Sequence, residues 1–275
     1  MGEQKFNKLN WLSRNLPEGL LADAAWLEEK GYYGSLRKKY VDAGWLEQPA
    51  RGVYRRPRGS LSWDQVVVSL QSVMAFPVAV GGRTALELLG FAHYLTTSQR
   101  EAHLYCDRTL PGWVAKLPLE TAFIAHNRKR LFPDLEQKWP VPFAEHSGKV
   151  DATVLRQSHV QLLQQGPCAS PVVISTPERA VLELLDELPR RETFGQVDAL
   201  FDGMATLRPG HLHELLIHCR SIKVKRLFLF FAERHDHDWF AHVDQSCVDL
   251  GKGKRMLVKG GRLDSQYLIT VPKAF

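Results

Sequence analysis

The sequence has no long apolar run and only four cysteines. Its most apolar stretch, residues 227–232, is far shorter than the ~18–20 residues that cross a bilayer as a helix. The polar, basic residues 1–15 lack the apolar segment of a secretory signal. The four cysteines are Cys106, Cys168, Cys219 and Cys247, and no two of them form a Cys-x-x-Cys pair. These absences predict a cytoplasmic protein with reduced thiols, no membrane partner, no disulfides and no structural zinc.

Signatures of catalysis are also scarce. There is no Gly-x-Ser-x-Gly elbow, no Walker loop and no Gly-Ser step followed by the paired aspartates of nucleotidyltransferases. The outer histidines of residues 213–218 lie about 140° apart on a helix, which is wrong for a zinc protease. The nuclease-like elements of residues 133–138 normally come from separate strands, and the histidines and aspartates of residues 235–244 are more typical of a solvated loop than of a metal site. We therefore predict no catalytic residue, no metal and no cofactor.

The charge of the chain is concentrated in one segment. The 275 residues include 36 Lys+Arg and 30 Asp+Glu, and 44% are hydrophobic, as in a globular protein with room for about two domains. Between positions 31 and 58, seven basic residues face only two acidic ones, so nearly all of the net charge of +6 lies there. A local basic patch indicates a surface that meets polyphosphate, although a solvated basic face would have the same composition.

The pattern in this segment predicts a helix-turn-helix. Residues 20–30 have apolar positions at helical spacing and end at Gly31, which suits the left-handed position after a helix. Ser35 is the expected N-cap of a second helix over residues 36–43, which Gly44 closes. On a helical wheel the apolar positions of this second helix share one face, and its first cations project from the opposite side.

A hairpin is expected directly after the second helix. Residues 45–47 and 53–55 favour two short strands, with Arg51 and Gly52 at the tip of the turn between them. Helix, turn, helix and hairpin in this order form a winged helix-turn-helix, in which a helix enters the major groove of DNA and the hairpin reaches the neighbouring backbone. The expected DNA contacts are Ser35, Arg37, Lys38 and Lys39 on the helix, and Arg51, Arg55 and Arg56 on the hairpin.

Two further basic groups lie outside this segment. One is residues 127–130, and the other lies near the C-terminus, where glycines would let backbone amides approach a phosphate. Each could be a second nucleic-acid surface or a solvated loop. The C-terminal group contains Lys252, Lys254, Arg255, Lys259 and Arg262.

The remaining chain predicts a mixture of helices and strands. The fold class is therefore α+β, with a winged helix-turn-helix over residues 1–59 and a larger mixed α/β domain over residues 60–275. Ser62, Thr84 and Thr176 are the expected N-caps of three helices. Helices are expected over residues 62–75, 85–89, 176–188, 194–204, 209–220 and 223–234, and strands over residues 103–105, 121–125, 153–155, 172–174, 256–258 and 267–271.

Four motifs carry a resemblance to a known family. The segment SLRKKYVDAGWLEQPARGVYRRP, residues 35–57, resembles the N-terminal winged helix of AbiEi-type antitoxins. Three further segments look like landmarks of that family's C-terminal domain. They are GRTALELLGF (within residues 81–91), ISTPERAVLELL (residues 174–185) and LGKGKRMLVKGGRLDSQYLITVP (residues 250–272). The four motifs together span most of the chain in the order of the family.

The resemblance implies a transcriptional autoregulator rather than an enzyme. In that family the antitoxin of a type IV toxin–antitoxin, or abortive-infection, system binds duplex DNA at inverted repeats in its own promoter. It counters a nucleotidyltransferase toxin without necessarily forming a stable complex with it. Two alternatives stay open: a nucleic-acid-processing enzyme that its winged helix addresses to DNA, and a stand-alone regulator without a toxin, which the neighbouring gene would distinguish.

Overall fold

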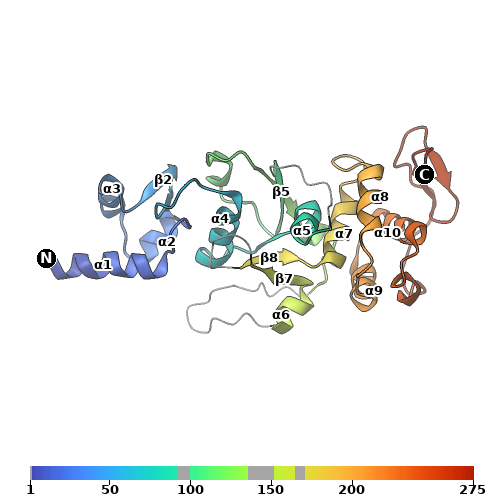
Figure 1. Cartoon of the computed structure of the whole chain (residues 1–275), viewed down its shortest axis with the longest axis horizontal. Coiled ribbons are helices and arrows are strands. Elements are labelled where there is room, and N and C mark those ends of the chain that lie inside the picture. The colour runs from blue at the N-terminus through green and yellow to red at the C-terminus, as the bar shows by residue number, and fades with distance from the viewer. Residues whose placement is uncertain (1, 92–99, 136–151, 165–170) are drawn as a thin grey trace.

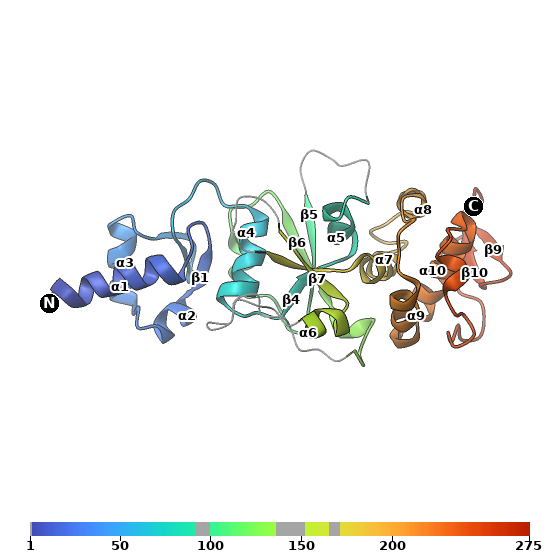
Figure 2. The same cartoon turned by 60° about the horizontal axis from the view of Figure 1, so that its bottom comes forward.

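The computed structural model describes residues 2–91, 100–135, 152–164 and 171–275. Its parts follow one another along the long axis of the molecule, with the two chain ends far apart (Figure 1). A small N-terminal sheet with its helices comes first, a five-stranded sheet lies in the middle, and a group of helices with a two-stranded sheet lies at the C-terminal end (Figure 2). No helix of these residues is long and apolar enough to cross a membrane.

The N-terminal part has the element order of a winged helix. Its three strands form one antiparallel sheet in the order β1-β3-β2, and β2 and β3 make the hairpin. The aromatic ring of Trp11 packs on those of Trp26 and Tyr32, so the first helix covers the turn between the next two. The elements are α1 (Gly2–Asn15), β1 (Leu21–Asp23), α2 (Ala24–Glu29), α3 (Gly34–Asp42), β2 (Glu47–Ala50) and β3 (Val53–Arg55).

Three expectations for this part are wrong. The first hairpin strand, expected over residues 45–47, is β2 and covers Glu47–Ala50. The helix expected over residues 20–30 begins only at Ala24, because Leu21 to Asp23 pair with β3 and Asp23 then caps α2 through its carboxylate. Ser35 is not a cap: Tyr33 is the N-cap residue of α3, and Ser35 lies in its first turn. The helix α1 was not expected, whereas Gly31 and Gly44 end α2 and α3 with positive φ as the pattern predicts.

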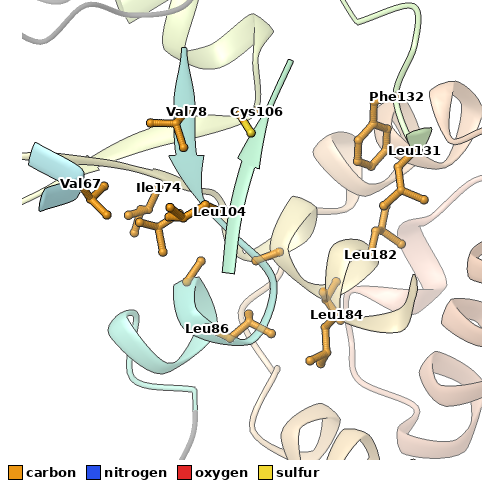
Figure 3. Close-up of a cluster of buried hydrophobic side chains, with 14 of the residues drawn as sticks. Val67, Val78, Leu86, Leu104, Cys106, Leu131, Phe132, Ile174, Leu182 and Leu184 are labelled. Atoms are coloured by element: carbon orange, nitrogen blue, oxygen red, sulfur yellow. The ribbon is translucent and has the colours of Figure 1, made fainter. Parts of the chain in front are cut away.

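The middle part is a mixed sheet in the order β6-β5-β4-β8-β7. Strand β4 pairs antiparallel with β5 and parallel with β8, so the sheet brings together segments from both halves of the chain. Figure 3 shows buried side chains from these strands and the adjacent helices in one cluster. The elements are α4 (Trp63–Val68), η1 (Ser69–Val73), β4 (Val78–Val80), α5 (Gly82–Leu88), β5 (Glu101–Cys106), η2 (Val114–Lys116), β6 (Ala122–Asn127), η3 (Arg128–Arg130), α6 (Ala152–Gln157), β7 (Val160–Leu163) and β8 (Val172–Ser175).

Helices dominate the C-terminal part. They pack through the phenylalanines of α8 and α10, as in the stacked pair Phe201 and Phe231. The hairpin of β9 and β10 follows them near the end of the chain. The elements are α7 (Pro177–Asp186), α8 (Phe194–Asp202), α9 (Pro209–His218), α10 (Ile222–His235), η4 (Phe240–His242), β9 (Arg262–Asp264) and β10 (Ile269–Val271).

The α+β class and most of the expected helices agree with the structure. The strand expected at residues 153–155 is the helix α6, whose Leu155 packs on a small cluster with Val160 and Val173. Thr84 is not an N-cap, since Gly81 precedes α5 and the Thr84 hydroxyl instead accepts from the His103 amide. The strand expected at residues 256–258 is also wrong; strand structure begins at Arg262. Cys168 and residues 136–138 of the nuclease-like segment 133–138 lie outside the described residues.

Candidate nucleic-acid interface

Arg37 connects the parts of the winged helix. Its guanidinium donates to the carbonyl oxygens of Tyr32 (2.8 Å) and Ala24 (3.1 Å), and Nη1 lies 3.7 Å from the Glu28 carboxylate. The same group sits over the Tyr54 ring, 5.6 Å from its centroid. The expectation that Arg37 projects away from the protein is therefore wrong, because its long side chain turns back onto α2 and the hairpin.

A polar stripe forms the outer face of α3. Ser35, Lys38, Lys39 and Asp42 are exposed and lie at the spacing of three and four residues that places side chains on one helix face. The Tyr33 side chain makes no cap hydrogen bond at the amino end of α3, where the Leu36 amide donates to the Tyr33 carbonyl oxygen at 2.9 Å. This stripe, with two cations and a helix amino end, can contact phosphate oxygens and base edges in a groove.

The hairpin tip lies next to this helix in the chain and holds one exposed cation. Arg51 is exposed in the turn between β2 and β3, and Gly52 beside it has a φ of +82°. The Gly52 carbonyl accepts from the Ala24 amide at 2.8 Å, which connects the tip to the start of α2. This bond holds the backbone of the turn beside Arg51 against the start of α2.

The other two hairpin arginines bind inside the protein. Arg55 is buried and donates to the Glu47 carboxylate at 2.6 Å and to the Gly59 carbonyl. Arg56 donates to the carbonyl oxygens at the end of α1, those of Ser13 and Leu16, both at 3.0 Å. The structure does not present these two side chains as expected, since Arg55 faces the cross-strand glutamate and Arg56 caps the C-terminal end of a helix.

Two exposed aromatic residues flank α3 and were missed in the sequence. Tyr33 precedes the helix with 60% of its surface exposed, and Trp45 follows it with 53% exposed. Large aromatic side chains in such positions are typical of interaction surfaces. The sequence signal was present, because each aromatic residue stands beside the glycine that borders the helix.

The C-terminal basic group lies near a buried arginine, on the loop before β9 and at the first residue of that strand. Arg226 of α10 donates to the carbonyl oxygens of Leu250 (2.8 Å) and Gly253 (2.7 Å). These bonds hold the glycine-containing loop against the helix. The five cations that follow are all exposed, namely Lys252, Lys254, Arg255, Lys259 and Arg262.

The histidines considered as metal ligands make hydrogen bonds within the protein. His235 Nε2 lies 2.8 Å from the Asp198 carboxylate, and His237 Nε2 lies 2.7 Å from the Phe201 carbonyl oxygen. His213 Nδ1 lies 3.0 Å from the Asp244 carbonyl oxygen. Within the described ranges, no group of three or more metal-ligating side chains is arranged to hold an ion.

Two of the sequence landmarks meet at one buried carboxylate. Glu183 of α7 accepts from the Gly82 amide (2.9 Å), the Ser175 hydroxyl (2.9 Å) and Arg179 Nε (2.8 Å). A Cβ atom at Gly81 would lie 2.2 Å from Glu183 Oε2, so the chain needs a glycine there. The motifs at residues 81–91 and 174–185 thus build one contact between α5, β8 and α7.

Comparison with known families agrees with this architecture. A family model described as "Transcriptional regulator, AbiEi antitoxin N-terminal domain" matches residues 5–97, and one described as "Transcriptional regulator, AbiEi antitoxin, Type IV TA system" matches residues 99–272. The chain belongs to the AbiEi antitoxin family. The resemblance expected from the four motifs is confirmed, and the N-terminal AbiEi model extends beyond the winged helix to include α4, β4 and α5.

A solved structure has the same fold as this AbiEi family member. The crystal structure of the RV2827C protein from Mycobacterium tuberculosis matches with a TM-score of 0.53 at 13% sequence identity, over 95% of this chain and 88% of that chain. At this identity the likeness concerns the fold alone. A search of curated proteins found no match.

Proposed function

We propose that this AbiEi family member is a DNA-binding autoregulator that acts as the antitoxin of a type IV toxin–antitoxin system. The observation that carries the DNA-binding step is the exposed stripe of Ser35, Lys38 and Lys39 on α3, beside a hairpin with Arg51 at its tip. A winged helix with cations on these two elements suits duplex DNA.

In the proposed complex α3 lies in the major groove. Lys38 and Lys39 contact phosphates and base edges, and the Ser35 hydroxyl and the first-turn amides bind a phosphate at the helix amino end. Arg51 reaches the adjacent backbone or minor groove. Arg37, Arg55 and Arg56 act indirectly, because their guanidinium groups hold α1, α2 and the hairpin in place.

The remaining parts of the proposal concern the rest of the chain. Residues 1–59 form the DNA-binding domain and residues 60–275 the antitoxin-specific domain. The operator is an inverted repeat in the protein's own promoter, and the protein acts in the cytoplasm. It opposes a nucleotidyltransferase toxin through regulation or transient blocking, without an enzymatic reaction of its own.

The test is a binding titration of the full chain on its promoter DNA at several salt concentrations. Lys38→Ala combined with Lys39→Ala should weaken binding and reduce the slope of log K against log salt by about 0.9 for each lost phosphate contact. Lys116→Ala is the matched control, because Lys116 is an exposed lysine of η2 outside the winged helix. An affinity and slope equal to those of the control would contradict the proposal.

A further inference from the structure

A basic cleft lies in the C-terminal two thirds of the chain, away from the winged helix. It has a volume of about 760 Å³ and lies where β6, the end of α7 and the start of α10 meet. This volume is within the range of pockets that hold small ligands. Five cations line it, namely Arg130, Arg190, Arg191, Arg220 and Lys223.

These cations outnumber the carboxylates of the cleft. Asp186 and Glu187 are the two acidic residues of the lining. Asp186 lies 3.3 Å from Arg130 and 3.4 Å from Lys223, so one carboxylate is shared between two cations. The lining therefore keeps an excess of positive charge, which favours an anion of more than one negative charge.

Two of the cations are available for a ligand. Arg190 and Arg220 are exposed, and neither has an ion pair within the part of the chain that the structure describes. Arg191 by contrast lies 3.6 Å from the Glu187 carboxylate. A guanidinium without a carboxylate partner can offer two parallel hydrogen bonds to a phosphate group.

Lys223 is held in a fixed position in the lining. Its ammonium donates to the carbonyl oxygens of Asp186 (2.6 Å) and Leu188 (2.9 Å). Burial lowers the pKa of Lys223, and the Asp186 carboxylate opposes that shift. Ser221, the N-cap of the 14-residue helix α10, also lines the cleft, so the positive end of that helix adds to the cations.

An apolar wall stands beside the cations. Met256 is 75% exposed, and Leu257, Leu188 and Pro189 line the cleft with it. The exposed Met256 thioether gives the cleft a polarizable surface against which an aromatic ring can pack. The cleft thus combines a site for phosphate groups with a site for a ring.

We propose that this cleft binds a nucleoside di- or triphosphate, with its phosphates on Arg190 and Arg220 and its base against Met256. Nucleic-acid backbone shares the phosphate chemistry, but the limited volume of the cleft and its apolar wall favour the small ligand. The inference goes beyond DNA binding by the winged helix and does not depend on it.

Isothermal titration calorimetry of the full chain tests the proposal. The probes are the four ribonucleoside triphosphates, inorganic tripolyphosphate, adenosine, a short single strand and a short duplex. At least one nucleoside triphosphate should bind, tripolyphosphate should compete with it, and adenosine alone should bind much more weakly. Arg190→Ala with Arg220→Ala should weaken nucleotide binding about tenfold for each guanidinium removed.

The controls separate this cleft from other basic surfaces. Lys116→Ala and the pair Lys38→Ala with Lys39→Ala should leave nucleotide binding unchanged, and Met256→Ala should weaken nucleotide binding more than tripolyphosphate binding. Failure of all four triphosphates to bind would overturn the proposal, as would equal binding by the double arginine variant with unchanged thermal unfolding. Binding of the single strand or duplex alone, lost in that variant, would assign the cleft to nucleic acid and overturn it as well.

Discussion

The winged-helix arginines fall into two groups according to what their guanidinium groups bind. Arg37, Arg55 and Arg56 donate to carbonyl or carboxylate oxygens of the protein, whereas Arg51 is exposed at the hairpin tip. A charged group that replaces its water shell with several protein acceptors stabilises the fold, and its removal leaves those acceptors unpaired. Identical residue types close together in the sequence therefore have different roles.

Arg37→Ala should lower stability. The variant loses two hydrogen bonds to carbonyl oxygens, an ion pair with Glu28 and the contact with Tyr54, so we expect the free energy of unfolding to fall by about 1–3 kcal/mol. Urea denaturation followed by circular dichroism measures it. Lys38→Ala, at the next position on the exposed stripe, is the control and should change stability by less than about 0.5 kcal/mol. A stability equal to that of the control would show that Arg37 is not a structural residue.

Arg51→Ala should lower DNA affinity without lowering stability. An arginine on a short hairpin meets phosphates or a narrow minor groove, so affinity for operator and random DNA should fall by similar factors. Titrations on both DNAs provide the comparison. If only operator binding weakened and random DNA bound as before, Arg51 would be a base-reading residue instead.

At the scale of elements, the contact of α5 with α7 depends on glycine at the start of α5. The Glu183 carboxylate and the Tyr105 ring occupy the space where a side chain at Gly81 would lie, with Tyr105 Cδ2 2.5 Å from an added Cβ. Neither neighbour can move freely, because both are buried and Glu183 accepts hydrogen bonds from Ser175, Arg179 and Gly82. The absence of a side chain at Gly81 therefore lets α5 and α7 pack closely.

Gly81→Ala should destabilise the central part of the protein. Overpacking of a filled core costs about 1–3 kcal/mol, and disturbance of the Glu183 hydrogen bonds adds to it. Gly112→Ala is the matched control, because an added Cβ there would have no neighbour within 4 Å. Thermal and urea unfolding of both variants would decide the matter, and equal stabilities would contradict the close contact.

The adjacent strands β5 and β6 carry a histidine pair from which we expect a pH-dependent stability. His103 and His126 stack with ring centroids 5.1 Å apart, and burial, followed by the nearby His126, Arg191 and Arg83, lowers the pKa of His103 to about 4. The unfolded chain therefore binds this proton more readily. The stabilisation is fully present above about pH 6.5 and is lost as the pH falls toward 4, up to about 3 kcal/mol.

His103→Phe tests this dependence. The variant keeps an aromatic ring but cannot titrate, so its free energy of unfolding should fall less between pH 6.5 and 4 than that of the wild type. Denaturation curves at several pH values measure the difference. His242→Phe, at an exposed histidine, should retain the wild-type slope, and a wild-type slope in His103→Phe would refute the assignment.

For the whole molecule, the proposal is that the protein regulates without turnover. The elements that suggested a metal site engage in hydrogen bonds, as His235 does with Asp198 and His237 with the Phe201 carbonyl. The proposed DNA-binding face and the basic cleft lie in separate parts of the chain, so each can be altered without touching the other. DNA binding by the winged helix and nucleotide binding by the cleft are therefore open to separate tests.

Elemental analysis should find no stoichiometric metal in the purified protein, and assays with Mg²⁺, Mn²⁺ or Zn²⁺ should find no hydrolysis of DNA, RNA or nucleotides. The physical reason is that a catalytic ion needs several convergent ligands. Two outcomes would instead favour the nucleic-acid-processing enzyme. One is bound metal that is lost in the double variant His235→Ala with His237→Ala, and the other is hydrolysis that is lost in the double variant Asp134→Ala with Glu136→Ala.

Much of this protein was determined by local sequence. Helix caps and apolar periodicity act within a few residues. The helix starts at Ser62, with Gln65 in its first turn, and at Thr176, before Pro177, were therefore predictable from the sequence. The helices α8 to α10 were predictable for the same reason. The position of the basic segment and the family motifs were visible for the same reason.

Only the tertiary structure decided features that depend on residues far apart in the chain. The direction of the Arg37 side chain depends on Ala24 and Tyr54, and the sheet joins β4 to β8 across the chain. The basic cleft is built from four separate segments, namely residues 124–126 with 130, 186–191, 220–221 with 223, and 256–257. Burial and hydrogen bonding stabilise such contacts whatever the distance in sequence between the residues, whereas local propensities depend only on residues that are close in sequence.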